Sequence, residues 1–110
     1  MSVRDINQEE FVSLIADNEL VVIDCWATWC MPCKSFGEAF EEVSKDYPDI
    51  LFCKLNVENN KDFTNDLVIK SVPTVMIIKE GTIIFKEDGT MPKKSLVELI
   101  ENAKQVTIEQ

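Results

Sequence analysis

Cys30 and Cys33 are the residues of this chain whose type and spacing most directly favour chemistry. They are separated by Met31 and Pro32 and lie between an apolar run and a segment with helical periodicity. At a helix N-terminus, unpaired backbone N–H groups and the helix dipole stabilise an anion, and therefore a thiolate. We expect Cys30 to be the thiolate nucleophile and Cys33, one turn further on, the thiol that resolves a mixed disulfide. Pro32 fits the first helical turn, where a missing N–H loses no hydrogen bond.

Three other interpretations of this Cys-x-x-Cys pair compete with thiol chemistry. A zinc site would need further ligands, and the chain contains no histidine and only two more cysteines, Cys25 and Cys53, each alone in a predicted strand. A structural disulfide would close a loop too short to constrain the unfolded chain much. Buried, unreactive thiols belong in a core more than at a junction between strand and helix. We therefore expect no metal, and we interpret Cys25 and Cys53 as small core residues.

Asp24 is an ionisable residue inside an otherwise apolar run, LVVIDCWA at residues 20–27. A carboxylate without a partner in such a place is unfavourable and has a raised pKa, so groups of this kind tend to be functional. Side chains alternate between the faces of a strand. Cys25 is therefore expected on the face opposite to Asp24, and Cys53 on the face opposite to Lys54.

The elements that must position these residues follow one another in a regular order. Four β-rich apolar runs predict strands, at residues 20–27, 50–57, 74–79 and 82–86. Apolar residues at helical spacing predict helices that begin after Asn7 and after Cys30 and that cover residues 62–69 and 93–104. Glu80 and Gly81 predict a hairpin turn. This order favours an α/β fold whose sheet is mainly parallel, with helices on both faces and an antiparallel edge.

Size and charge limit the domain organisation and the classes of partner. The 110 residues are 45% hydrophobic, which suits one domain over residues 1–110. Twenty acidic and eleven basic residues give a net charge of -9, which repels nucleic-acid phosphates and anionic lipids. We expect neither nucleic acid nor a membrane as a partner. The first residues contain no apolar segment typical of a secretory signal, so we expect a cytoplasmic, reducing location.

The segment WATWCMPCK at residues 26–34 resembles the active-site segment of the thioredoxin family. The resemblance spans nearly the whole chain and includes Asp24, KLNV at residues 54–57, the triplet Val72, Pro73 and Thr74, and Gly81 and Gly89. It implies the thioredoxin fold, a mixed five-stranded sheet flanked by four helices, with Cys30 at the start of the second helix and Pro73 in cis facing it. Met31 departs from the glycine usual in the family, and LVIKS precedes Pro73 where glycines are common.

The resemblance also implies roles for individual residues. Asp24 would lie beneath the cysteine pair and accept the proton of Cys33, directly or through water, with Lys54 as its compensating partner. The alternative for Asp24 and Lys54 is a structural ion pair. A shelf beside the thiolate would accept an extended substrate segment and would consist of Trp29, Val72, Pro73, Thr74 and Gly89. The alternative for Trp29 is ordinary packing, which is the role we expect for Trp26.

The activity implied by the resemblance is the reduction of protein disulfides by a reversible Cys30/Cys33 dithiol cycle. No cofactor would bind to the chain, and electrons would come from NADPH through a thioredoxin reductase. The expected partners of this monomer are that reductase and disulfide-containing proteins such as peroxidases. A disulfide isomerase or oxidant of the same fold is one alternative, and a thioredoxin-fold binding module without catalysis is another.

Overall fold

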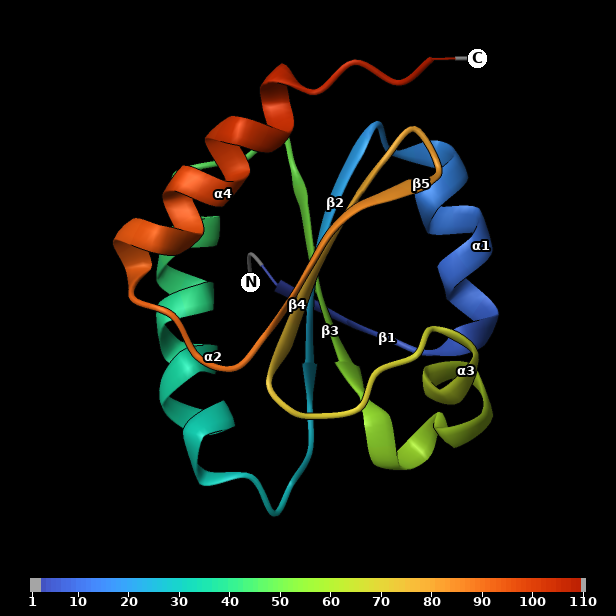
Figure 1. Cartoon of the computed structure of the whole chain (residues 1–110), viewed down its shortest axis with the longest axis vertical. Coiled ribbons are helices and arrows are strands. Elements are labelled where there is room, and N and C mark those ends of the chain that lie inside the picture. The colour runs from blue at the N-terminus through green and yellow to red at the C-terminus, as the bar shows by residue number, and fades with distance from the viewer. Residues whose placement is uncertain (1–2, 110) are drawn as a thin grey trace.

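A five-stranded sheet forms the centre of the computed structural model, which describes residues 3–109 (Figure 1). The strands are β1 (Val3–Ile6), β2 (Leu20–Trp26), β3 (Leu51–Asn56), β4 (Thr74–Lys79) and β5 (Thr82–Asp88), in the spatial order β1-β3-β2-β4-β5. β3 is parallel to β1 and β2, whereas β4 is antiparallel to β2 and β5. The predicted α/β class and the mixed sheet implied by the family resemblance are confirmed. The mainly parallel sheet favoured by the order of elements is not, because two of the four strand pairings are antiparallel.

Helices cover both faces of this sheet. They are α1 (Gln8–Asp17), α2 (Met31–Ser44), α3 (Lys61–Asp66) and α4 (Lys93–Gln105), with a short 3-10 turn, η1 (Val57–Asn59), after β3. Helices α2 and α4 lie on one side and α1 and α3 on the other (Figure 1). None of the helices in the described part of the chain is long and apolar enough to span a bilayer.

The alternation of side chains along β2 and β3 sorts the residues of interest between two cores. The core under α2 and α4 contains Val22 and Phe52, and the core under α1 and α3 contains Cys25 and Cys53. Asp24, two residues from Val22 along β2, therefore faces α2. The prediction that both cysteines lie opposite to Asp24 and Lys54 is confirmed.

Local signals explain where several elements begin and end. Asn7 caps α1 by accepting a hydrogen bond from the Glu10 N–H at 3.0 Å, and the Glu10 side chain accepts one from the Asn7 N–H in return. Glu80 and Gly81 both have positive φ, 48° and 80°, as a two-residue hairpin between antiparallel strands requires. Both predicted features are confirmed.

The apolar periodicity of the sequence did not predict strand β1. Val3 and Ile6 are its only buried residues, and they contribute to opposite cores. The strand therefore shows no alternation of apolar and polar residues, which is the usual signal for a strand. Only the family resemblance implied this fifth strand. The helices after Cys30 and near residue 62 also end earlier than their apolar patterns suggest, at Ser44 and Asp66.

Candidate active site

Cys30 and Cys33 are joined by a disulfide at the N-terminus of α2, with their Cα atoms 5.3 Å apart. Cys30 is the N-cap residue, and its sulfur accepts a hydrogen bond from the Cys33 N–H at 3.2 Å. Pro32 lies in the first turn of the helix, as predicted. The sulfur of Cys30 therefore occupies the place where helix termini stabilise negative charge.

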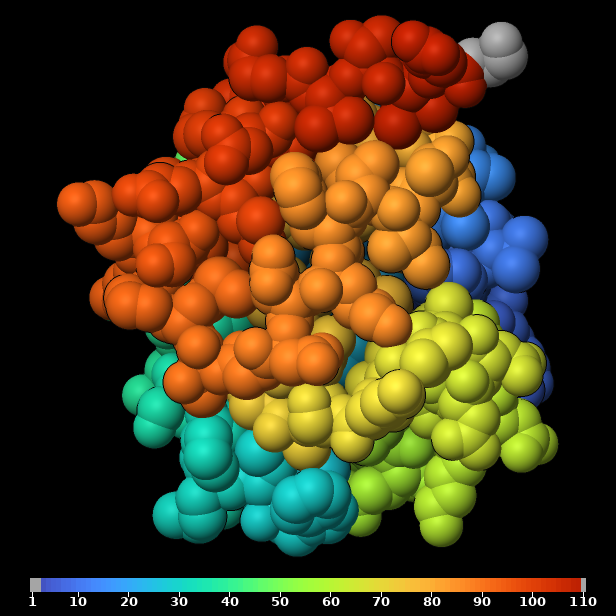
Figure 2. All heavy atoms as spheres, viewed as in Figure 1, coloured from blue at the N-terminus to red at the C-terminus, as the bar shows by residue number. Residues whose placement is uncertain are grey.

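The Val72–Pro73 peptide bond is cis, and the Val72 carbonyl faces this disulfide. The Cys30 sulfur lies 3.7 Å from the carbonyl oxygen of Val72, and the Val72 side chain packs against the small cluster that contains both cysteines. Figure 2 shows the chain around residue 30 and the chain around residue 72 meeting at one edge of the molecule. The arrangement implied by the family resemblance is therefore present.

Hydrogen bonds hold the Val72–Pro73 segment from behind. The Thr74 hydroxyl, fully buried, lies 2.7 Å from the carbonyl oxygen of Ser71 and 3.2 Å from a carboxylate oxygen of Asp88. The N–H of Gly89 donates to the carbonyl of Pro73 at 2.8 Å. Thr74 and Gly89, which the resemblance assigned to the substrate shelf, thus support this segment through hydrogen bonds, Thr74 from a buried position and Gly89 from a half-buried one.

Two large apolar side chains beside the disulfide are exposed to solvent. Trp29 and Met31 are each 70% exposed, whereas Cys30 and Cys33 are each 4% exposed. An exposure of this size excludes ordinary core packing as the role of Trp29. Trp26, in contrast, is half-buried and packs beside the cysteine cluster, as expected. Exposed apolar side chains next to a reactive group are typical of a binding surface.

Asp24 is fully buried, and neither of its carboxylate oxygens has a hydrogen-bond partner among residues 3–109. Burial raises the pKa of this carboxyl to about 7, while the positive charge of Lys54 opposes the rise. Lys54 is the register partner of Asp24 on β3, but its Nζ lies 5.0 Å from the centre of the Trp26 ring. Within residues 3–109, Asp24 and Lys54 therefore do not form a direct ion pair.

A single pocket connects this buried carboxyl with the dithiol. Asp24, Cys33 and Lys54 all line it, together with residues of the loop after β2 and of the exposed face of α2. Because the pocket opens to solvent past Lys34 and Glu38, it offers room for water between the Asp24 carboxyl and the Cys33 sulfur. Asp24 and Cys33, the expected proton acceptor and donor, thus line the same pocket.

Cys25 and Cys53 are free thiols without any exposure. Burial raises the pKa of Cys53 to about 12 and raises that of Cys25 further still. Both thiols therefore stay protonated at neutral pH and react poorly. No group of three or more His, Cys, Asp or Glu side chains among residues 3–109 is arranged to hold a metal ion.

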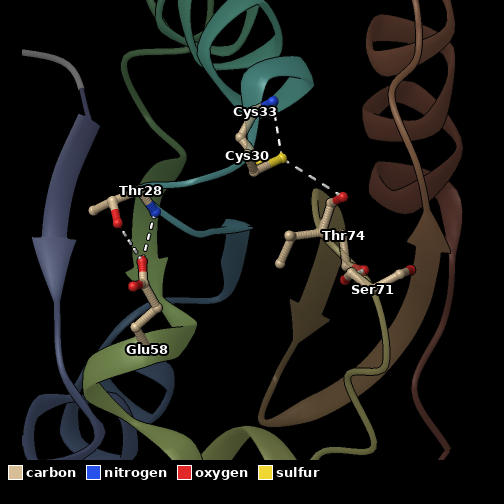
Figure 3. The surroundings of a disulfide bond; sticks show 7 residues. Thr28, Cys30, Cys33, Glu58, Ser71 and Thr74 are labelled. Carbon is tan, nitrogen blue, oxygen red and sulfur yellow. Dashed lines mark hydrogen bonds between the residues drawn. A yellow bond between two sulfur atoms is a disulfide. The ribbon is translucent and has the colours of Figure 1, made fainter.

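One contact beside the disulfide involves residues that the sequence did not single out. An oxygen of the Glu58 carboxylate accepts hydrogen bonds from the Thr28 N–H at 2.6 Å and from the Thr28 hydroxyl at 2.7 Å. These bonds lower the pKa of Glu58. Figure 3 shows this contact on one side of the disulfide and the Ser71–Thr74 contact on the other. No local pattern links residues so far apart in the chain.

Comparisons with known proteins agree with this geometry. A family profile described as Thioredoxin matches residues 2–102. A putative thioredoxin 2 of Streptomyces coelicolor is 34% identical over 109 residues, which cover 99% of this chain and 81% of the relative.

Two solved structures add to this likeness. A chain in a complex of ferredoxin:thioredoxin reductase with thioredoxin f2 is 30% identical with a TM-score of 0.86, covering 93% of this chain and 94% of that one. A chain in a structure that describes thiol resolution of a yeast mitochondrial 1-Cys peroxiredoxin via the glutathione and thioredoxin systems is 31% identical with a TM-score of 0.84, covering 92% and 95%.

Proposed function

The chain belongs to the thioredoxin family and is a thiol-disulfide oxidoreductase that reduces protein disulfides, and we propose how its own residues perform this reaction. One observation carries the proposal: the Cys30–Cys33 disulfide lies at the N-terminus of α2, with the Cys30 sulfur 3.7 Å from the Val72 carbonyl beside Pro73. This placement supports Cys30 as nucleophile and the Val72–Pro73 segment as the strip along which a substrate binds.

In the first step, the Cys30 thiolate of the dithiol form attacks one sulfur of a substrate disulfide. A bond forms between Cys30 and that sulfur, the substrate S–S bond breaks, and the other substrate sulfur leaves as a thiolate that takes a proton. The helix N-terminus stabilises the Cys30 thiolate before the attack. Trp29, Val72 and Pro73 provide the apolar surface beside the reacting sulfur, which suits an extended segment of a substrate.

In the second step, the Cys33 thiol gives its proton to the Asp24 carboxylate and attacks the Cys30 sulfur. The Cys30–Cys33 disulfide forms, and the second substrate sulfur leaves as a thiolate, so that two electrons have passed from the dithiol to the substrate. A carboxyl whose pKa is about 7 suits this role because it holds and releases a proton near neutral pH. The shared pocket supports transfer through water, and Lys54 limits the rise of the Asp24 pKa.

The oxidised form then requires two electrons, and we propose NADPH as their source, through a thioredoxin reductase. The related chain in complex with ferredoxin:thioredoxin reductase supports a reductase as partner, although its electron donor is of another type. The related chain in the peroxiredoxin structure supports thiol peroxidases as substrates. The chain would thus transfer electrons in cellular redox homeostasis.

We further propose that the protein acts as a cytoplasmic monomer without a bound cofactor. Two free thiols, Cys25 and Cys53, are typical of proteins in a reducing compartment. Cell fractionation and light scattering of the purified protein would test location and oligomeric state. A protein recovered from an oxidising compartment, or as a stable dimer, would contradict these two statements.

Coupled turnover tests the catalytic proposal. We expect the wild type, with NADPH and a thioredoxin reductase, to reduce a disulfide-bonded protein and to consume NADPH. Cys30→Ser should lose this activity by about a thousandfold or more, whereas Cys25→Ser, the matched control, should retain it. Retained activity in Cys30→Ser would refute the assignment of the nucleophile.

The same assay separates the alternatives. Activity with dithiothreitol but not with the reductase would refute only the electron donor. A wild type that reduces nothing with either reductant would identify a binding module. A chain that reactivates a scrambled protein faster than it reduces a native disulfide would be an isomerase.

A further inference from the structure

We propose that Glu58 is a positioning residue, which holds the turn bearing Trp29 and Cys30 in the orientation needed to reduce disulfides of folded proteins. This inference rests on the proposed function and adds to it a residue that the dithiol cycle does not use. The role follows from the two hydrogen bonds that Glu58 accepts from Thr28 and from the position of Thr28 in the turn.

The turn between β2 and α2 is fixed at its two ends by Ala27 and Cys30, which are buried in the cysteine cluster. Within it, the Cys30 N–H donates to the carbonyl of Ala27 at 3.2 Å. Thr28 and Trp29 are exposed, so that no core packing holds this part of the turn. The bonds to Glu58, at 2.6 and 2.7 Å, are short, and bonds to a charged acceptor are stronger than neutral ones. They therefore define the path of the chain into Cys30.

Glu58 is itself well anchored. It belongs to η1, directly after β3, and its N–H donates to the Asn56 side chain at 2.8 Å. Asn56 is the register partner of Trp26 on the parallel strand β2. Thr28 and Glu58 thus continue from neighbouring strands past the same edge of the sheet. Hydrogen bonds through Glu58 thus connect the turn to the end of β3 in the central sheet.

The Thr28–Glu58 contact lies on one side of the disulfide, and the Ser71–Thr74 contact, which holds the Val72–Pro73 segment, lies on the other (Figure 3). Together the two contacts set the separation of the Cys30 turn from the Val72 carbonyl. A folded protein substrate has to touch Trp29 on one side and Val72 on the other while its disulfide reaches Cys30. A small disulfide has to reach only the Cys30 sulfur. Loosening the turn should therefore impair the reduction of protein disulfides selectively.

The test compares two disulfides and four variants at saturating reductase. We expect Glu58→Ala to lower kcat/KM for a disulfide-bonded folded protein about tenfold, chiefly through KM, and to change the rate with a small aromatic disulfide such as dithionitrobenzoate by less than about twofold. Glu58→Gln keeps an acceptor oxygen without the charge and should stay within about twofold of the wild type on both disulfides. Thr28→Val should lose part of the activity on the protein, and Thr28→Ser should not.

Four outcomes would overturn the role of Glu58. These are equal losses on both disulfides in Glu58→Ala, no loss on either, a Glu58→Gln variant as slow as Glu58→Ala, or a Thr28→Val variant that reduces the protein at the wild-type rate. Circular dichroism would verify that each variant is folded, and if Glu58→Ala unfolds, Thr28→Val decides. A wild type that reduces neither disulfide would overturn the proposed function together with this role.

Discussion

At the scale of single residues, environment distinguishes four chemically identical side chains. Cys30 caps a helix and lies beside the Val72 carbonyl, and Cys33 lines the same pocket as Asp24. Cys25 and Cys53 lie on the opposite side of the sheet, where burial raises their pKa values. Reactivity follows from position, since all four carry the same thiol.

The division of labour between Cys30 and Cys33 predicts which variant traps substrate. Cys33→Ser should accumulate a covalent mixed disulfide through Cys30, because attack remains possible while resolution does not. Cys30→Ser should trap much less. Non-reducing gels and mass spectrometry after incubation with a disulfide-bonded protein would measure the adducts. Stronger trapping by Cys30→Ser than by Cys33→Ser would reverse the assigned roles.

Asp24→Asn should stabilise the fold and slow turnover. The folded protein holds the Asp24 proton up to a pKa of about 7, compared with an ordinary value of 3.8, so wild-type stability falls as the pH rises between these values and is level above them. Asp24→Asn does not lose stability in this way, because asparagine has no carboxyl that ionises. Its advantage should grow across that window to about 4 kcal/mol, and its turnover should fall about tenfold or more.

Denaturant unfolding at several pH values, together with coupled turnover, would measure both effects of Asp24→Asn. Glu38→Gln is the matched control, because Glu38 lies exposed at the mouth of the same pocket. Its stability and turnover should stay close to those of the wild type. An Asp24→Asn variant that is fully active, or less stable at neutral pH, would refute the role of the buried carboxyl.

At the scale of elements, the site depends on where strands end and helices begin. β2 delivers the turn that leads into α2, β3 delivers Glu58, and β4 starts directly after Pro73. The hairpin between β4 and β5 sets the register that brings Gly89 back to the Pro73 carbonyl.

The turn at the far end of this hairpin contains a residue poorly suited to its backbone. Glu80 has φ 48°, a left-handed conformation that glycine and asparagine adopt more easily.

Glu80→Asn should therefore stabilise the protein by about 0.5–1 kcal/mol. The hydrogen bond from the backbone N–H of residue 80 to the Glu19 carbonyl, 2.8 Å long, is retained because it does not involve the side chain. Glu80→Gln removes the same charge without the turn preference and should leave stability nearly unchanged. The free energy of unfolding in denaturant is the measurement. Equal stabilities of the Asn and Gln variants would show that the charge, and not the backbone, matters.

At the scale of the whole molecule, a buried lysine joins the central sheet to the C-terminal helix. Lys79, at the end of β4, is 7% exposed, and its Nζ donates to the carbonyl oxygens of Ala103, Lys104 and Val106 at 3.0, 3.0 and 2.5 Å. Carbonyls at a helix C-terminus lack partners within the helix, and a cation there also complements the helix dipole. Lys79 therefore attaches α4, which covers the same face of the sheet as α2.

Lys79→Met should lower the free energy of unfolding by about 2–3 kcal/mol, because it removes the charged donor of three carbonyls at the C-terminus of α4, one of them buried and two half-buried. Lys94→Met, at an exposed position on α4, serves as the control and should change stability by less than about 0.5 kcal/mol. Chemical denaturation measures the stability, and hydrogen exchange of the α4 amides measures attachment of the helix. Equal stability of the two variants would refute this role of Lys79.

Much of this protein follows from local sequence patterns. The dithiol, the run with Asp24, the cap at Asn7 and the hairpin at Glu80 and Gly81 are each short segments whose chemistry or backbone demands can be recognised without the fold. Alternation along a strand was also sufficient to separate Cys25 from Asp24, because the two faces of a strand are fixed by its geometry.

Only the tertiary structure decided the contacts between segments that are distant in the chain. β1 has one buried residue for each core and no periodic signal, and Glu58 and Thr28 resemble ordinary surface residues in the sequence. Lys79 looks like a solvated charge at a strand end, yet it lies inside the protein beneath α4. Such contacts depend on which chain ends meet at one edge of the sheet, and packing determines this, since local propensity carries no information about distant partners.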